Sequence, residues 1–248
     1  MTANTARRVE RVMGTAVTLD ARSPIEPDGV DEAMEFLHWV DRTFSVYRMD
    51  SEISRIGREE LSPDDAAPEV REVLGACNTL RRATDGWFEH EPRSRPGRRL
   101  DPSAYVKGWA IERAAEIIRS PSARFCLSAG GDLVAVGTTN GRDGWRVGIR
   151  HPDDPQRLAA AVIVSNGALA TSATYERGEH IWCGEMSDRA LRSVSVIGPS
   201  LATADALATA VFAAGRLHME WLLGFPEYGV LAIDHDLRLH HSPWIELA

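Results

Sequence analysis

The sequence is poor in cysteine, in excess positive charge and in long apolar runs. Three cysteines in 248 residues cannot form the closed disulfide framework of a small secreted scaffold, and a chain of this length does not need one. No segment approaches the roughly 18 consecutive apolar residues of a membrane-spanning helix. Acidic residues outnumber basic ones by 36 to 28, for a net charge of −8, whereas a protein that binds the phosphate backbone needs a basic surface. These features argue against a disulfide scaffold, a membrane span and a nucleic-acid partner.

The N-terminal segment carries no visible export signal. Arg7 and Arg8 are not followed by an apolar stretch, and no cysteine stands where a lipid anchor attaches. We therefore expect a cytoplasmic protein in which residues 1–8 form a flexible tail. The loop-like stretches at 23–29, 62–67 and 91–99 are short, so we expect one domain over residues 1–248.

Hydrophobic residues, 44% of the chain, are arranged with two different periods. Helical spacing of apolar residues occurs at 30–44, 69–82 and 108–119, and the alanine-rich, nearly uncharged segment 203–215 predicts a fourth helix that is buried on several sides. Strand signals occur at 16–21, 125–128, 133–136, 145–149, 158–164, 193–197, 230–233 and 237–240, with a hairpin turn at 234–236. Helices are concentrated in the first half and strands in the second. We therefore predict an α+β fold in which helices pack on a largely antiparallel sheet.

Asp205 and Thr209 are the polar side chains of an otherwise apolar helical segment that ends before Arg216. They are four residues apart, so their oxygens lie on one helical face. A buried carboxylate without a partner is unfavourable, and a hard cation such as Mg²⁺, which prefers oxygen ligands, offsets that cost. In the alternative interpretation, the helix macrodipole stabilises Asp205 and the Thr209 hydroxyl bonds a carbonyl one turn back.

A turn-rich segment beginning at Asp101 leads into a helix with Lys107 at its start. Helix N-termini attract phosphate, and a lysine there adds a positive charge. Asp101 is suited to hold a ribose hydroxyl or a ring N–H. Alternatively, Lys107 is simply solvated at the start of a helix.

Two further segments have a structural and a chemical interpretation. The Gly130-Gly131 pair before Asp132 lets a backbone approach a ligand closely, or forms a tight turn between strands. Small hydroxyl residues at 171–174 precede His180, a candidate base that is equally explained as a structural histidine. The cysteines at 77, 126 and 183 lack C-x-x-C spacing and are interpreted as small core residues.

Taken together, these motifs occur in the order found in the ApbE family, the FAD:protein FMN transferases, which the sequence resembles from about Val12 to Gly215. The motifs are Met13-Gly14-Thr15, Phe44-Ser45-Val46-Tyr47, Asp50-Ser51-Glu52-Ile53-Ser54, Asp101-x-x-Ala104-x-x-Lys107-Gly108, Ala129-Gly130-Gly131-Asp132, Ala170-Thr171-Ser172 and Ala204-Asp205-Ala206-Leu207-Ala208-Thr209.

The resemblance implies a fold similar to the T-fold and an enzyme that uses Mg²⁺ to cleave FAD. Such an enzyme attaches FMN through a phosphoester to a Thr or Ser of an acceptor protein and releases AMP. By resemblance, Asp205, Thr209 and the carbonyl of Ala104 hold the metal, and Asp205 and the candidate base His180 are the catalytic residues. The residues that resemblance assigns to FAD contact are Met13, Tyr47, Trp87, Phe88, Glu89, Asp101, Lys107 and Ile181.

The sequence departs from the family pattern in two places. The family's Ile-Asp-Pro-x-Thr-Gly stretch is absent after His180, where Ile181 is followed by Trp182-Cys183-Gly184. The Gly-x-Phe-Asp element ends in Glu89. Two alternatives remain open: a hydrolase that converts FAD to FMN and AMP with water as acceptor, and an FAD-binding protein without catalysis.

Overall fold

The computed structural model describes residues 7–91, 100–138, 144–173, 190–216 and 218–248. Its centre is an eight-stranded sheet in which every paired neighbour is antiparallel. The strand order is β1 (Arg7–Val12), β2 (Thr15–Ala21), β3 (Phe125–Ala129), β4 (Asp132–Val136), β7 (Gly167–Ala173), β8 (Leu191–Gly198), β9 (Gly229–Asp234) and β10 (Leu239–His241).

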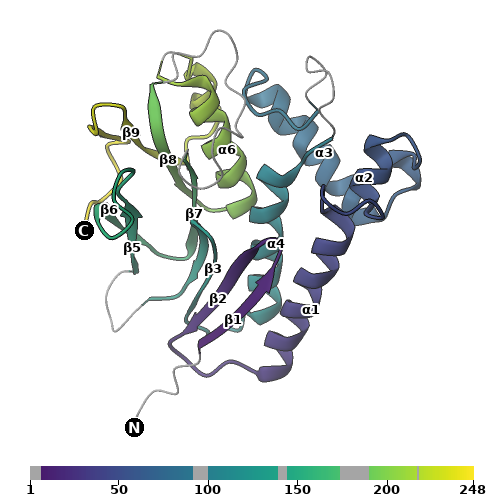
Figure 1. Ribbon diagram of the computed structural model, residues 1–248. Helices are drawn as coiled ribbons and strands as arrows, with labels where there is room; N and C mark the ends of the chain where they lie inside the picture. The colour runs from purple at the N-terminus through teal and green to yellow at the C-terminus, as the bar shows by residue number, and fades with distance from the viewer. Residues whose placement is uncertain (1–6, 92–99, 139–143, 174–189, 217) are drawn as a thin grey trace.

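Helices cover one face of this sheet (Figure 1). They are α1 (Pro27–Phe44), α2 (Glu52–Gly57), α3 (Pro68–Ala83), α4 (Ser103–Ile118) and α6 (Leu201–Ala214), with short 3₁₀ turns at Pro63–Asp65 and Glu220–Gly224. Proline stands in the first turn of α1 and of α3, where its missing N–H has no intrahelical partner to lose. Among the described residues, no helix is long and apolar enough to cross a membrane.

Helix α6 lies between the sheet and α4 and is buried on nearly all sides. Its alanines remove bulk where two layers meet, so neighbouring backbones approach closely. The closest approach is at Gly108 of α4, where an added Cβ would lie 2.5 Å from the carbonyl oxygen of Leu201. This glycine therefore sets how near α4 comes to the start of α6.

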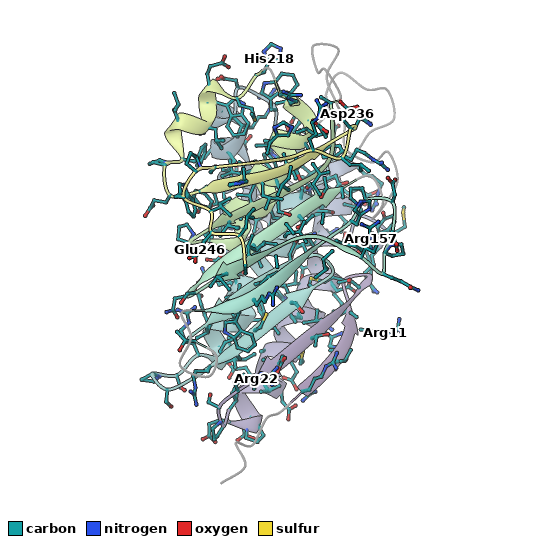
Figure 2. The ribbon with its side chains drawn as sticks, turned by 90° about the vertical axis from the view of Figure 1, so that its left-hand side faces the viewer. Arg11, Arg22, Arg157, His218, Asp236 and Glu246 are labelled. Carbon is teal, nitrogen blue, oxygen red and sulfur yellow. The ribbon has the colours of Figure 1, made fainter. Side chains whose placement is uncertain are left out.

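The other face of the sheet carries the antiparallel pair β5 (Trp145–Arg150) and β6 (Leu158–Val164). Trp145 and Val162 of this pair belong to a second apolar cluster with Leu133, Leu169 and Leu231 of the main sheet. Figure 2 views this side, with Arg22 after β2 and Asp236 in the β9–β10 turn toward opposite ends of the sheet.

The predicted α+β class is confirmed, and all four predicted helices and all eight predicted strands are present with ends shifted by a few residues. The sequence analysis did not predict β1, α2 or β7. Arg7 and Arg8, expected in a flexible tail, instead pair with Asp20 and Leu19 in β1. The tail expectation was therefore wrong for these two residues, because backbone pairing to β2 orders a segment whose side chains are exposed.

Candidate active site

Three charged side chains from distant parts of the chain meet between the helices and the sheet. The Nζ of Lys107 in α4 lies 2.7 Å from Oδ2 of Asp132 at the start of β4 and 3.8 Å from Oδ1 of Asp205 in α6. Asp132 and Asp205 are buried, with 0% and 2% of their surface exposed. We call these three residues the charged cluster. Among the described residues, both carboxylates therefore approach the same lysine.

Backbone groups fix the orientation of both carboxylates. The other oxygen of Asp132 accepts the N–H of Thr171 in β7 at 3.0 Å, and Oδ2 of Asp205 accepts the N–H of Gly108 at 3.2 Å. Both carboxylates are therefore held on one side by the backbone while their other oxygens face Lys107. Desolvated, pre-oriented charges of this kind are typical of functional sites.

The helix terminus does not explain Asp205. Asp205 is the fifth residue of α6, and its start is capped by Ser200, whose side chain accepts the N–H of Thr203. Oε2 of Glu112 also accepts the N–H of Ala202 and the hydroxyl of Ser200, at 3.0 and 2.8 Å. These groups serve the orphan N–H groups of the helix, so the Asp205 carboxylate is oriented toward Lys107 instead.

Hydroxyl groups continue the polar region one helical turn further along α6. The Thr209 hydroxyl lies 3.2 Å from the Ser172 hydroxyl, and the Thr171 hydroxyl lies 2.9 Å from that of Ser195. Ala104 lies in the first turn of α4, ahead of Lys107.

The oxygen donors fit a hard cation better than a soft one. Within the described ranges, no group of three or more His, Cys, Asp or Glu side chains has the arrangement of a metal site. A cation at this position would therefore need hydroxyl and carbonyl oxygens besides a carboxylate, which is a donor set suited to Mg²⁺.

Lys107 links the charged cluster to a pocket with a volume of about 270 Å³. This is close to the lower end of the range for small-molecule sites. The residues that line it are Met13, Gly14, Val40, Asp41, Phe44, Ser45, Val46, Tyr47, Ser103, Val106 and Lys107. The structure thus brings together three of the predicted FAD contacts: Met13, Tyr47 and Lys107.

Met13 and Tyr47 lie in different surroundings, one in a tight turn and the other on an exposed segment. Met13 has a φ of 53° in the tight β1–β2 turn, a left-handed conformation that is uncommon outside glycine and asparagine. Tyr47 follows α1 and leaves 90% of its surface exposed. Both side chains have the flat or flexible apolar surfaces that pack against aromatic rings.

The other predicted FAD contacts that the structure describes do not line this pocket. Phe88 is buried, with 1% of its surface exposed. The ring of Trp87 stacks on His218 with 5.6 Å between centroids, and Glu89 accepts from Nε of Arg81 at 2.8 Å. Asp101 is exposed, and its Oδ1 accepts the N–H of Ser103 at 3.0 Å. The predicted residues His180 and Ile181, as well as Cys183, lie outside the described residues.

The two described cysteines fit the core interpretation. Burial raises the pKa of the Cys77 thiol far above its usual range and raises the pKa of Cys126 to about 12. Neither thiol ionises near neutral pH, and the thiolate is the reactive form.

The sequence analysis assigned no role to Asp132, although it placed a turn at the preceding glycines. Gly130 has a φ of 62° between β3 and β4, so the tight-turn interpretation is confirmed. The overlooked signal is the aspartate itself, which opens the strand Asp132-Leu133-Val134-Ala135-Val136, otherwise wholly apolar. An isolated carboxylate at the end of a buried strand needs a partner.

Comparison with known proteins gives a consistent result. A model of the ApbE family matches residues 13–91 and 89–231. An FAD:protein FMN transferase of Treponema pallidum is 30% identical over 210 residues, covering 74% of this chain and 58% of that protein. Another, of Rhodobacter capsulatus, is 34% identical over 152 residues, covering 56% of this chain and 28% of that protein. The chain therefore spans less than two thirds of the length of either relative.

Solved structures agree on the fold. The crystal structure of an ApbE protein of Thermotoga maritima matches with a TM-score of 0.80 at 22% identity, covering 97% of each chain. The flavin transferase ApbE of Vibrio cholerae matches with a TM-score of 0.79 at 21% identity, also covering 97% of each chain. The family match extends over both the pocket and the charged cluster, and the chain belongs to the ApbE family.

Proposed function

We propose that this chain is an FAD:protein FMN transferase. The observation that carries the proposal is the position of Lys107, which lines an apolar pocket and also pairs with two buried carboxylates. A dinucleotide has the matching shape, because a flat apolar ring system is joined to a pyrophosphate. Relatives over much of the chain bear the name of this activity.

The pocket residues are suited to hold the ring system and the first phosphate of FAD. Met13 and Tyr47 provide apolar surface for the ring, and the ammonium of Lys107 attracts a phosphate. In a chain with a net charge of −8, a pyrophosphate needs such local positive charge. Trp87, Phe88, Glu89 and Asp101 are the candidates for contact with the rest of the dinucleotide.

Asp205, Thr209 and the Ala104 carbonyl would hold Mg²⁺, as their oxygen donors suggest. When bound, Mg²⁺ supplies polarisation of the phosphoryl oxygens and neutralises negative charge. Lys107 keeps the phosphate oriented, and the buried cluster keeps the lysine ammonium in place through Asp132.

The transfer step breaks the phosphoanhydride bond of FAD and forms a phosphoester bond to the acceptor. The hydroxyl oxygen of an acceptor Thr or Ser attacks the phosphorus on the FMN side of FAD, and the bond from that phosphorus to the bridging oxygen breaks. AMP leaves with the bridging oxygen, and FMN stays on the acceptor. The hydroxyl proton passes to a base, for which His180 is the candidate.

The test is incubation of the purified protein with FAD and Mg²⁺, followed by detection of AMP. A second reaction contains the acceptor domain of a covalent flavoprotein, and in-gel flavin fluorescence reports transfer. The same domain with its acceptor Thr replaced by Ala is the control. We expect fluorescence only on the domain with the intact Thr. Free FMN and AMP without labelled domain would identify a hydrolase, and FAD binding without AMP would identify a binding protein.

A further inference from the structure

We propose that Ser51 is a positioning residue that holds the Tyr47 side of the pocket in shape. This inference rests on the proposed function, which places the ring system of FAD in that pocket. It also accounts for the Asp50-Ser51-Glu52-Ile53-Ser54 motif, to which the reaction itself gives no role.

The segment between α1 and α2 forms one rim of the pocket through Ser45, Val46 and Tyr47. Two large side chains of this segment are solvent-exposed: Tyr47 at 90% and Met49 at 61%. Val46 packs against the core, but side-chain burial does not fix the exposed part of the rim that follows it. The conformation there depends on hydrogen bonds, which are obligatory for backbone groups shielded from water.

Ser45 is the point where these hydrogen bonds converge. Its carbonyl oxygen accepts the hydroxyl of Ser51 at 2.7 Å and that of Ser54 at 3.4 Å. Its N–H donates to the carbonyl of Asp41 at the end of α1, and its hydroxyl accepts the N–H of Tyr47 at 3.4 Å. This first residue of the rim is thus fixed from both helices.

The Ser51 hydroxyl both donates and accepts a hydrogen bond. It donates to the Ser45 carbonyl and accepts the N–H of Ser54 at 3.1 Å, which caps the start of α2. Ser51 is buried, with 1% of its surface exposed, so water does not readily replace either bond. Removing the hydroxyl leaves a buried acceptor and a buried donor without their closest partner.

Arg58 supports the far end of the same rim. Its Nη2 donates to the carbonyl of Met49 at 2.7 Å, and Glu60 orients the guanidinium through a 2.7 Å bond to Nε. Ser51 and Arg58 therefore hold the segment on either side of Tyr47. A ring that stacks on Tyr47 then meets a pre-ordered surface, and pre-ordering lowers the entropic cost of binding.

Ser51 is not among the residues that line the pocket, and the charged cluster lies at the Lys107 end. Loss of the Ser51 hydroxyl should weaken binding of the ring in the ground state and the transition state alike. Uniform weakening raises KM and leaves kcat unchanged.

The main experiment compares Ser51→Ala with Ser51→Thr, which keeps the hydroxyl. We expect Ser51→Ala to raise KM and the Kd for FAD by about 3- to 10-fold with unchanged kcat, because the loss of its two hydrogen bonds loosens the rim. Ser51→Thr should stay near wild type. Ser62→Ala is the matched control, because the exposed Ser62 also caps a helical turn, at the N–H of Asp64.

A double-mutant cycle separates positioning from general destabilisation. If Ser51 acts through Tyr47, then Ser51→Ala has no further effect on FAD binding in a Tyr47→Ala background. Hydrogen exchange of the ligand-free protein adds a readout without activity: Ser51→Ala should speed exchange at residues 46–49, and Ser62→Ala should not. If Ser51→Ala does not fold, Arg58→Ala removes the other support and carries the same expectations.

The results distinguish this inference from the proposed function. Wild-type protein that releases AMP, combined with a Ser51→Ala variant of wild-type KM, overturns the positioning role alone. So does an effect of Ser51→Ala that persists without Tyr47. Wild-type protein that binds no FAD overturns the proposed function, and the role of Ser51 with it.

Discussion

In the part of the chain that the structure describes, buried aspartates lie in two regions that differ in how the carboxylates are neutralised. At the β9–β10 turn, Oδ1 of Asp234 accepts the N–H groups of Asp236 and Arg238, each at 2.9 Å, and Oδ2 lies 2.8 Å from Nε2 of His240. These partners come from the same hairpin, and Arg216, just after α6, adds a longer ion pair of 3.8 Å to Oδ2. In the charged cluster, Asp132 and Asp205 share Lys107, and the three come from separate elements.

The difference suggests different purposes. Local backbone donors around Asp234 stabilise the turn that they belong to, and the hydrogen bond with His240, together with those N–H groups, lowers the pKa of Asp234. The charged cluster keeps two buried carboxylates near one another, which does not favour folding by itself. Such an arrangement is expected where a cation or a charged substrate completes the site.

The strongest test of this comparison is to neutralise one carboxylate in each region. Asp205→Asn keeps an oxygen that can accept the N–H of Gly108 but removes the charge. We expect AMP release from FAD to fall by about 100-fold or more, as for loss of a metal ligand in phosphoryl transfer. Asp234→Asn should retain wild-type turnover. Activity of Asp205→Asn near wild type at saturating Mg²⁺ would contradict the assignment.

A second prediction concerns the helix contact that brings the charged cluster together. In Gly108→Ala, the new Cβ would lie 2.5 Å from the Leu201 carbonyl oxygen, so α4 and α6 must separate. We expect the free energy of unfolding to fall by about 2 kcal/mol, measured by urea denaturation. The control is Gly75→Ala in α3, because nothing lies within 4 Å of the added Cβ. Alanine favours a helix over glycine by about 1 kcal/mol, so the free energy of unfolding of this variant should not fall.

The third prediction uses Mg²⁺ as a ligand of the protein without FAD. Binding at ten times Kd stabilises a protein by about 1.4 kcal/mol. Mg²⁺ should therefore raise the thermal midpoint of wild type and of Asp234→Asn, and should not raise that of Asp205→Asn. The reference value is the thermal midpoint of each protein in calcium-free buffer with EDTA. An equal rise in all three proteins would place the cation elsewhere.

The helical layer could be predicted from the sequence because its signals are local. The apolar stripe of α1 has helical periodicity, and the run that forms α6 is nearly uncharged and rich in alanine, a strong helix former. Strand β1 escaped prediction because Arg7, Val9 and Arg11 are exposed and the strand depends on its pairing with β2. Strand β7 escaped it because its small residues are buried on both faces and show no alternation.

The candidate site was only partly readable for the same reason. Asp205 and Thr209 lie one turn apart on one helix, so their proximity follows from helix geometry. That Lys107 contacts Asp132 and Asp205 is a property of the folded chain, since the three lie on α4, β4 and α6. The support of Tyr47 by Ser51 likewise depends on hydrogen bonds between α1 and α2, which no periodic pattern reveals.

The smallest expected effect concerns the pH dependence of the hairpin carboxylate. The hydrogen bonds around Asp234 lower its pKa in the folded protein, so the folded state favours the ionised form more than the unfolded state does. The resulting stabilisation is fully present above the ordinary carboxyl range near pH 4 and is lost as the pH falls through the lowered pKa. Urea midpoints of wild type and Asp234→Asn should therefore differ at pH 6 and converge toward pH 3. A difference that stays constant over this range would mean that the charge of Asp234 does not stabilise the turn.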